Sequence, residues 1–401
     1  MSEVLSKAPP AVSPGSGINE EHRILRQTVR RFAESEVAPR AFAIDREDKF
    51  PHDLYRKMAG LGLLGLNTEE EYGGSGADEM STVIALEELA RVSGMIANAC
   101  LLAKLQAELI CRRGNEAQIR RFVPDIVSGE LICLIAVTEP DAGSDVGNIK
   151  TTARREGDHW VLNGTKAFMT AGAVGRLAVV LARTDPAAGS RGLTTFLVEA
   201  SPDGDPRKGF VVDHKDELMG MRGLATAGIA MSDTVVPEVN LLGEPGQGLA
   251  NVLGSFTNGR IVIAALALGL AVGAQDACLG YVSQRRAFGK PIGDFQAVRF
   301  MLADAAVDID AARLLIHHAA CLKDAGQPFA KEASVAKLFA SDAAVRVATN
   351  AVQIHGGYGY TKDAVVERIY RDVKLTQIYE GTNQIQRQII AKHIMSESAR
   401  S

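Results

Sequence analysis

The spacing of hydrophobic and polar residues changes twice along the chain. From residue 19 to about residue 134, apolar residues recur at the spacing of amphipathic helices, as at Ile84, Leu86, Leu89 and Val92. From about residue 135 to 243, short runs rich in β-branched residues lie between Gly, Pro, Asp and Ser residues, a pattern typical of strands and turns. Helical spacing returns after residue 248. The pattern therefore predicts a helical region, a β region and a second helical region.

Individual elements can be placed within these regions. Strands are predicted at Leu177–Leu181, Thr194–Val198 and Phe210–Val212. One long bundle helix is predicted from apolar residues that alternate steps of three and four: Phe295, Val298, Leu302, Ala305, Ile309, Ala312, Ile316 and Ala319. The run Ile261–Ala274 is too short, and too rich in Ala and Gly, to span a bilayer. We therefore expect a buried helix there and no membrane insertion.

Two glycine motifs predict local turns. Asn163 and Gly164 lie between two strand-like stretches, and both tolerate the positive φ angles of a type I′ turn, so a β-hairpin turn is predicted there. Gly60, Gly62 and Gly65 match the spacing of a nucleotide-binding loop. A helix-like segment, and not a strand, precedes these glycines, so we expect a helix cap and turn instead.

Composition and charge narrow the class of protein. The 401 residues are 46% hydrophobic and 23% charged, an ordinary globular mixture that disfavours a disordered or collagen-like chain. Lys and Arg number 44 against 48 Asp and Glu, for a net charge of -4. This near balance disfavours a nucleic-acid partner. The first 17 residues are rich in Ser, Pro and Gly and lack the features of a signal peptide. We expect a flexible tail and a cytoplasmic location.

Metal binding is not expected. The five cysteines include no C-x-x-C pair, which indicates a reducing compartment and small buried thiols in place of structural zinc. His317 and His318 are adjacent on a predicted helix and point to different sides, so they cannot chelate one ion.

Three polar, glycine-containing segments are candidates for ligand binding: Val137–Asp145, Gln353–Tyr360 and Ile378–Arg387. Taken separately, each also fits a simpler role. The first fits an Asx turn or a helix cap. The glycines of the second fit a helix end as well as a backbone that approaches a phosphate. A single Glu before Gly and Thr, as in the third, is most often a solvated side chain.

Together and in this order, the segments resemble the acyl-CoA dehydrogenase family, from about residue 19 to 394. The resemblance also rests on Asn163–Thr170 and Arg285–Pro291. It implies a mainly α fold with a central β domain. The expected parts are a tail at 1–17, an N-terminal helical domain at 18–134, a β-barrel-like middle domain at 135–244 and a C-terminal four-helix bundle at 245–401.

The resemblance implies FAD-dependent α,β-dehydrogenation of an acyl-CoA thioester to the trans-2-enoyl-CoA. Glu380 matches the family's catalytic base, which takes the α proton while flavin N5 takes the β hydride. A carboxylate needs a raised pKa for this task, and a dry pocket raises the pKa by desolvation. Some members instead carry a glutamate just before an arginine of the bundle. Here Gly259 precedes Arg260, so that position holds no base.

The resemblance also assigns FAD contacts. Residues that match those beside the isoalloxazine ring are Val137, Thr138, Phe168 and Thr170. Residues that match contacts from a neighbouring subunit to the adenosine and pyrophosphate are Arg285, Phe288, Gln296, Gln353 and Gly357. Two further matches, Thr382 and Gln384, follow the base. Because such a site needs two subunits, a homotetramer built as a dimer of dimers is predicted.

Substrate and partners are implied in the same way. Ser144, Arg260 and Gly381 match positions along the acyl-CoA site. The segment 97–102 matches the far end of the acyl pocket, and its small, mostly apolar residues fit a short to medium acyl chain, whether straight, branched or cyclic. Electrons are expected to pass to an electron-transfer flavoprotein. Two alternatives are an acyl-CoA oxidase or related flavin oxidase that uses dioxygen, and a non-catalytic acyl-CoA-binding protein, which the presence of Glu380 disfavours.

Overall fold

The computed structural model describes residues 17–398, so all of the predicted tail except residue 17 lies outside the described residues. Contacts within the chain divide it into two compact units. The helical unit contains residues 17–42, 79–97 and 260–398, and the mixed unit contains residues 43–78 and 98–259. Helix α5 (Gly94–Arg113) and helix α7 (Gly248–Gln284) each contribute residues to both units.

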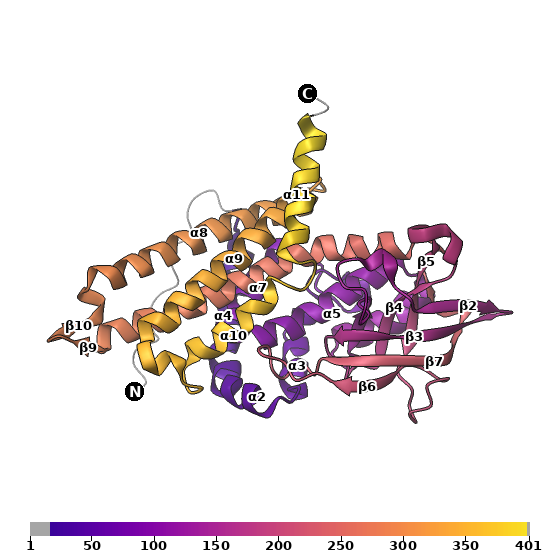
Figure 1. Cartoon of the computed structure of the whole chain (residues 1–401), viewed down its shortest axis with the longest axis horizontal. Helices are drawn as coiled ribbons and strands as arrows, with labels where there is room; N and C mark the ends of the chain where they lie inside the picture. Colours follow the sequence, from indigo (N-terminus) through magenta and orange to yellow (C-terminus); the bar gives the residue numbers. More distant parts are fainter. Residues whose placement is uncertain (1–16, 399–401) are drawn as a thin grey trace. The chain divides into compact units, whose positions relative to one another are not determined.

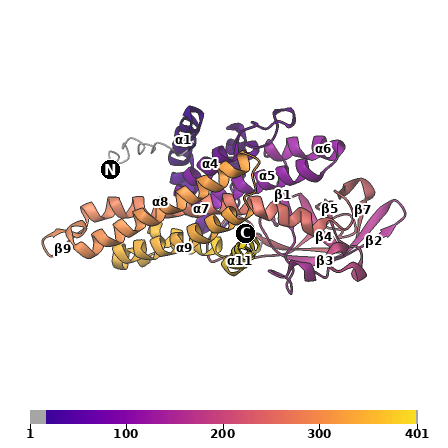
Figure 2. The ribbon, with the colours of Figure 1, turned by 90° about the horizontal axis from the view of Figure 1, so that it is seen from above.

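The helical unit contains long helices that lie side by side, and its last helix projects away from them (Figures 1 and 2). Its C-terminal part contains most of α7, then α8 (Gln296–Asp324), α9 (Ala330–His355), α10 (Val365–Thr376) and α11 (Asn383–Ser398). A two-stranded ribbon, β9 (Arg286–Ala287) with β10 (Lys290–Pro291), joins α7 to α8. From earlier in the chain, the unit takes α1 (Glu20–Phe32) and α4 (Glu79–Val92). The predicted bundle helix at 295–319 is thereby confirmed as α8.

Sequence features account for the ends and faces of these helices. Asn19 caps α1, because its side chain accepts from the His22 N–H while the His22 ring accepts from the Asn19 N–H. On α8, the predicted seam residues Ala305, Ile309 and Ile316 are buried. Residues 261–268 of α7 are all buried, because a helix that is apolar on every side needs packing partners all round.

The mixed unit is organised around an eight-stranded sheet. Its strands are β1 (Cys133–Ala136), β2 (Thr152–Glu156), β3 (His159–Met169), β4 (Leu177–Arg183), β5 (Leu193–Glu199), β6 (Val211–Lys215), β7 (Ala227–Pro237) and β8 (Leu241–Leu242). The order is β6-β7-β3-β2-β4-β5-β8, and β1 pairs with β4. A bridge between Ala200 and Phe210 brings the end of β5 to the start of β6, so the sheet curls on itself in the manner of a barrel.

The inner face of this sheet carries the core of the mixed unit. Trp160, Phe196 and Phe210 lie in one buried cluster, and the rings of Trp160 and Phe196 are 5.3 Å apart. The three strands predicted at 177–181, 194–198 and 210–212 correspond to β4, β5 and β6. The fold is mainly α with a central β domain, as predicted.

The mixed unit also contains α3 (His52–Gly60) and α6 (Glu116–Val127), and a short helix α2 (Ala41–Glu47) begins at the end of the helical unit's first segment. Gly60 is the last residue of α3, and Gly62 follows with φ of 73°. The glycines at 60–65 therefore end a helix, as predicted, and do not form a nucleotide-binding loop.

The predicted hairpin turn at Asn163–Gly164 is wrong. Both residues lie inside β3, at a bulge where the pairing with β7 shifts register. The turn before this strand is instead at Gly157, which has φ of 63°. Gly164 is required for a different reason, because a Cβ there would lie 2.4 Å from Thr151 Oγ1 and 2.8 Å from Thr151 Cα. The Thr151 backbone approaches β3 so closely that only glycine fits at this position. The turn preference of the Asn-Gly dipeptide contains no information about this contact.

Two helices, α5 and α7, are long and apolar enough to cross a membrane by length and composition alone. In their most apolar windows, however, 89% and 78% of the residues are buried within the protein. That burial is typical of core helices.

Candidate active site

Glu380 lies in the short turn between α10 and α11, in the helical unit. Its φ is 53°, and that of Gly381 is 88°, so two successive residues adopt the left-handed conformation. This conformation is ordinary for glycine but unusual for glutamate. Contacts with neighbouring side chains must therefore hold the turn in place, and such strain is typical of functional sites.

The Glu380 carboxyl has a strongly shifted pKa. Burial raises this pKa from 4.5 to about 7, against the opposing charges of Arg260 and Lys337. Its Oε2 atom is buried and has no hydrogen-bond partner among the described residues. Arg260 on α7 is itself buried, and one guanidinium nitrogen lies 3.5 Å from Ser334 Oγ. Glu380 and Arg260 are thus brought into one electrostatic cluster from positions 120 residues apart in the chain.

Two buried side chains hold the carbonyl groups of this turn. Lys337 Nζ, on α9, donates to the Gly381 carbonyl oxygen and to Asn383 Oδ1, each at 2.9 Å. Gln386 Nε2 donates to the Glu380 carbonyl oxygen at 3.3 Å and to that of Gly381 at 2.8 Å. Lys337 was not among the residues predicted from the sequence. The available signal was a lysine among small residues at positions 333, 336, 340 and 344, the face of α9 that is buried.

A second group of predicted residues lines a cleft of about 530 Å³ at the far end of the helical unit. Arg285 and Gly357 both line it. The Arg285 guanidinium lies 5.4 Å from the centre of the Tyr358 ring. Tyr281 and His355 stack beside it, with ring centres 4.2 Å apart. Arg285 and Gly357 are thus together in one cleft.

The remaining helical-unit candidates are dispersed. Phe288 is 94% exposed in the β9–β10 turn and packs edge-on against Phe295. Gln296 is exposed at the start of α8, and Gln353 is exposed in the last turn of α9. Thr382 precedes α11 and accepts from the Ile385 N–H at 3.4 Å, and Gln384 is exposed in the first turn of that helix.

In the mixed unit, four cofactor candidates lie on two adjacent segments. The Ala167 N–H donates to the Thr138 carbonyl oxygen at 2.9 Å, which places the end of β3 beside the segment after β1. Phe168 has φ of 62° within a second bulge of β3, and the residue is 64% exposed. A bulge redirects a side chain away from the strand's ordinary alternation. Val137 is buried, and Thr170 is half-buried beyond the bulge.

A buried ion pair supports these two segments. Lys166 Nζ lies 2.8 Å from Glu139 Oε1 and 3.2 Å from the Val137 carbonyl oxygen. The Glu139 carboxylate also accepts from the backbone N–H groups of Lys150 and Thr151. Burial lowers the pKa of Lys166 to about 8, although Glu139 favours its charged form.

The substrate candidates are distributed over both units. Ser144 is exposed in the loop after β1 of the mixed unit, whereas Arg260 and Gly381 belong to the helical unit. Residues 97–102 of α5 are buried, and Cys100 Sγ lies 3.4 Å from the Leu63 carbonyl oxygen.

Other clusters do not add chemistry. No group of three or more metal-ligating side chains occurs among residues 17–398. His317 is buried and His318 exposed, in agreement with their predicted opposite directions. The five cysteines are free thiols, but the prediction that all are buried is wrong, because Cys321 is exposed and Cys111 is half-buried.

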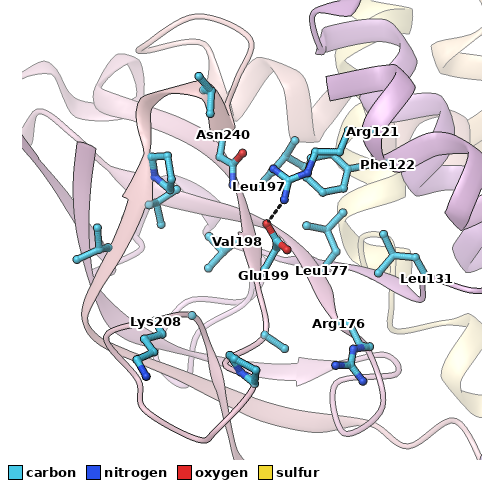
Figure 3. A pocket seen from close by; sticks show the side chains of 17 residues that line it. Arg121, Phe122, Leu131, Arg176, Leu177, Leu197, Val198, Glu199, Lys208 and Asn240 are labelled. Atoms are coloured by element: carbon cyan, nitrogen blue, oxygen red, sulfur yellow. Dashed lines mark hydrogen bonds and ion pairs between the residues drawn. The ribbon is translucent and has the colours of Figure 1, made fainter. Parts of the chain in front are cut away.

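The mixed unit contains a further cavity of about 510 Å³ between α6 and the sheet. Arg121 and Glu199 form an ion pair of 2.7 Å there, as Figure 3 shows. Lys208 on its wall is likewise paired with Asp203. None of the predicted site residues lines this cavity.

Comparison with known proteins identifies the family. The chain matches the acyl-CoA dehydrogenase N-terminal domain over residues 19–130, the middle domain over 134–234 and the C-terminal domain over 246–395. The chain therefore belongs to the acyl-CoA dehydrogenase family and is an oxidoreductase of that type. The family consists of flavoproteins of fatty acid metabolism.

Individual relatives are similar over nearly their whole length. An acyl-CoA dehydrogenase of Bacillus subtilis is 42% identical, with 94% of this chain and 99% of the relative covered. A short-chain specific acyl-CoA dehydrogenase of Clostridium acetobutylicum is 41% identical, with coverages of 94% and 98%. The solved structure of butyryl-CoA dehydrogenase from Megasphaera elsdenii has a TM-score of 0.90 at 37% identity, with coverages of 94% and 99%.

A fourth similarity concerns electron transfer. A chain in a structure described as an electron transferring flavoprotein of Acidaminococcus fermentans has a TM-score of 0.91 at 39% identity. The match covers 94% of this chain and 98% of that chain.

Proposed function

We propose that this chain dehydrogenates a short-chain acyl-CoA thioester to the trans-2-enoyl-CoA, with FAD as cofactor and Glu380 as the base that takes the α proton. The observation that carries the proposal is the buried Glu380 carboxyl, with its unpartnered Oε2 and its pKa raised to about 7. A carboxylate of that pKa is substantially ionised at neutral pH, and it is a stronger base than a solvated glutamate. Arg260 and Lys337 keep the pKa from rising further.

Glu380 also offers a backbone donor to the substrate. Within residues 17–398, its N–H makes no hydrogen bond, whereas its carbonyl and that of Gly381 both accept from Gln386. A preorganised N–H stabilises the negative charge that develops on a thioester oxygen when the α proton leaves. In this proposal, the same residue orients the thioester and removes the proton.

The predicted cofactor residues fit FAD in their chemistry. In the mixed unit, the exposed ring of Phe168 beside the Thr138 segment suits the planar isoalloxazine. In the helical unit, the Arg285 guanidinium and the exposed Gly357 backbone line one cleft, and this combination suits a pyrophosphate. When bound, FAD would supply the acceptor for the β hydride.

We propose the homotetramer that the family resemblance implies, and an exposed apolar surface on α8 supports an interface between copies of the chain. Phe300, Val307 and Leu314, spaced by seven residues, are 59%, 69% and 65% exposed, and we call them the α8 stripe. Residues at this spacing lie on one side of a helix, and exposed apolar patches of this kind mark protein interfaces. A second copy of the chain is the expected partner.

The substrate class and the electron acceptor rest on relatives. We propose a short-chain substrate because the Clostridium acetobutylicum relative is short-chain specific and the Megasphaera elsdenii structure is a butyryl-CoA dehydrogenase. We propose an electron-transfer flavoprotein as acceptor because a similar chain occurs in the Acidaminococcus fermentans structure. A cytoplasmic location and domain boundaries at 134/135 and 244/245 are part of the same proposal.

The direct test is the Glu380→Gln variant, which keeps the shape of the side chain but removes its basicity. We expect a yellow protein that binds butyryl-CoA and bleaches at least about 1,000-fold more slowly in anaerobic stopped-flow experiments. Glu397→Gln, an exposed change on α11, is the matched control and should bleach at the wild-type rate. Bleaching of Glu380→Gln at the wild-type rate would refute Glu380 as the base.

Two experiments separate the alternatives. A flavin oxidase would be reoxidised by dioxygen within its catalytic turnover time, whereas the proposed dehydrogenase should reoxidise slowly in air in the presence of product. A non-catalytic acyl-CoA-binding protein would remain colourless after incubation with FAD, although it would bind butyryl-CoA in calorimetry.

A further inference from the structure

Lys337 is a buried cation that faces the turn of the proposed base. It lies in the N-terminal half of α9, and its side chain is completely buried. Its Nζ donates to the Gly381 carbonyl oxygen and to Asn383 Oδ1, and both residues closely follow Glu380 in the chain. Buried lysines are rare because burial disfavours their charge, so a lysine at this position needs a specific reason.

The first reason is the conformation of the turn. Glu380 and Gly381 are both left-handed, and the Gly381 carbonyl accepts from Lys337 and from Gln386. Asn383, the other acceptor of Lys337, also donates to Ser341 Oγ at 2.9 Å and to Asp342 Oδ1 at 2.7 Å. These bonds tie the segment from Glu380 to Asn383 to α9, through Lys337, Ser341 and Asp342, and to α11, through Gln386. They fix the direction in which the Glu380 carboxyl leaves the backbone.

The second reason is charge. Burial lowers the pKa of Lys337 to about 7, while Glu380 and Asp342 favour its charged form. The other charged groups facing this cluster are Arg260 from α7 and Arg387 from α11, which lies 3.1 Å from Asp342. Asp372 on α10 interacts with the neighbouring Tyr379 hydroxyl. Lys337 both acts electrostatically on Glu380 and hydrogen-bonds to its turn.

We infer that Lys337 is a positioning residue for Glu380: its ammonium group holds the Glu380–Gly381 turn in the left-handed conformation and favours the carboxylate form of the base. This inference rests on the proposed function, in which Glu380 takes the α proton. Lys337 contacts neither substrate nor cofactor in this account, and it acts only through Glu380.

The test compares substitutions at Lys337 across a pH profile of kcat with butyryl-CoA. Lys337→Met removes both the positive charge and the hydrogen bonds. The acid limb of the profile, where kcat falls as the pH decreases, should therefore shift to higher pH by about one unit. The plateau value of kcat at higher pH should fall about tenfold. KM should change less than about twofold, since Lys337 does not contact the substrate. Lys337→Arg keeps the charge and should return the limb to near its wild-type position.

A matched control lies on the same helix. Lys331 pairs with Glu397 at 2.8 Å near the first turn of α9, away from Glu380. Lys331→Met should leave the limb and kcat unchanged. A Lys337→Met enzyme that loses thermal stability but keeps the wild-type acid limb would show that Lys337 is merely structural and would overturn the inference. If Lys337→Met does not fold, Lys337→Gln replaces it, because glutamine keeps a donor and loses the charge, so the same shift of the limb is expected.

The Glu380→Gln background separates the inference from the proposed function. There, Lys337→Met should change the residual rate less than about twofold, because Lys337 acts through the carboxyl that is already absent. Full activity of Glu380→Gln would refute the base and the proposed function. An inactive Glu380→Gln together with an unmoved limb in Lys337→Met would refute only the assignment of Lys337.

Discussion

Glu380 shows how one side chain can be made basic by its surroundings. A solvated glutamate has a pKa of about 4.5 and is a weak base, and burial raises the pKa of this one to about 7. Burial without any nearby positive charge would raise the Glu380 pKa further and leave the carboxyl protonated at neutral pH. Two cations, Arg260 and Lys337, oppose that effect. The balance leaves a group that can both hold a negative charge and accept a proton near neutral pH.

This balance predicts the pH dependence of the reaction. The base must be unprotonated to act, and its pKa is about 7, so protonation removes the active form below that pH. We expect the pseudo-first-order rate of flavin bleaching by butyryl-CoA to fall about tenfold per unit below pH 6.5 and to level off above pH 7.5. If the rate instead began to fall only near pH 4.5, the carboxyl that acts as the base would be a solvated one.

At the scale of elements, a buried ionic cluster joins three helices of the helical unit. Glu87 and Glu88 of α4 are nearly inaccessible. Arg26 of α1 contacts both, and Arg313 of α8 lies 2.9 Å from Glu87. Burial alone would raise the pKa of Glu87, but Arg26 and Arg313 outweigh burial and lower it to about 2. The folded state therefore stabilises the ionised form of Glu87.

Removing this charge should weaken the helical unit. Glu87→Gln removes the buried carboxylate that Arg26 and Arg313 share, although Arg26 keeps Glu88 and Arg313 keeps Asp310. We expect a loss of about 2 kcal/mol in the free energy of unfolding. The contribution should be fully present above pH 4.5 and lost as the pH falls toward 2, because the folded pKa is the lower one. Urea denaturation at several pH values measures this. Glu20→Gln, in an exposed pair with Arg23, should change little at any pH.

The bulge of β3 makes a second prediction at this scale. In Gly164→Ala, the new Cβ would lie within 2.8 Å of the Thr151 backbone, so strand β3 or its neighbour must shift. We expect a loss of about 2 kcal/mol in the free energy of unfolding, measured by urea denaturation. Gly143→Ala, where a Cβ meets nothing within 4 Å, should change it by less than about 0.5 kcal/mol. Equal effects of the two changes would contradict a close-approach role for Gly164.

At the scale of the whole molecule, the α8 stripe is the surface proposed above as an interface between copies of the chain. A Val307→Glu, Leu314→Glu double variant places charges on it, so the proposed tetramer should dissociate while the helical circular dichroism stays unchanged. Analytical ultracentrifugation reports the assembly. If the FAD site requires two subunits, the dissociated form should also lose FAD on gel filtration. Val239→Glu, at an equally exposed apolar residue outside the stripe, should keep both assembly and cofactor.

The sequence alone was sufficient to predict the fold class and the main elements, because periodicity of apolar residues follows directly from which faces are buried. It also singled out Glu380, Arg285 and Gly357, since these lie in motifs that are continuous along the chain. The family assignment agrees with the matched domains. The roles of the individual site residues stay predictions for the experiments above.

Tertiary structure alone decided how the base is surrounded. Lys337 and Arg260 meet the Glu380–Gly381 turn from α9 and α7, and no local pattern can reveal a contact between residues that lie far apart in the chain. The same limit explains the wrong turn at Asn163–Gly164. The Asn-Gly dipeptide indicates only which backbone conformations are locally favourable. The close approach of Thr151 determines the conformation that the folded strand adopts.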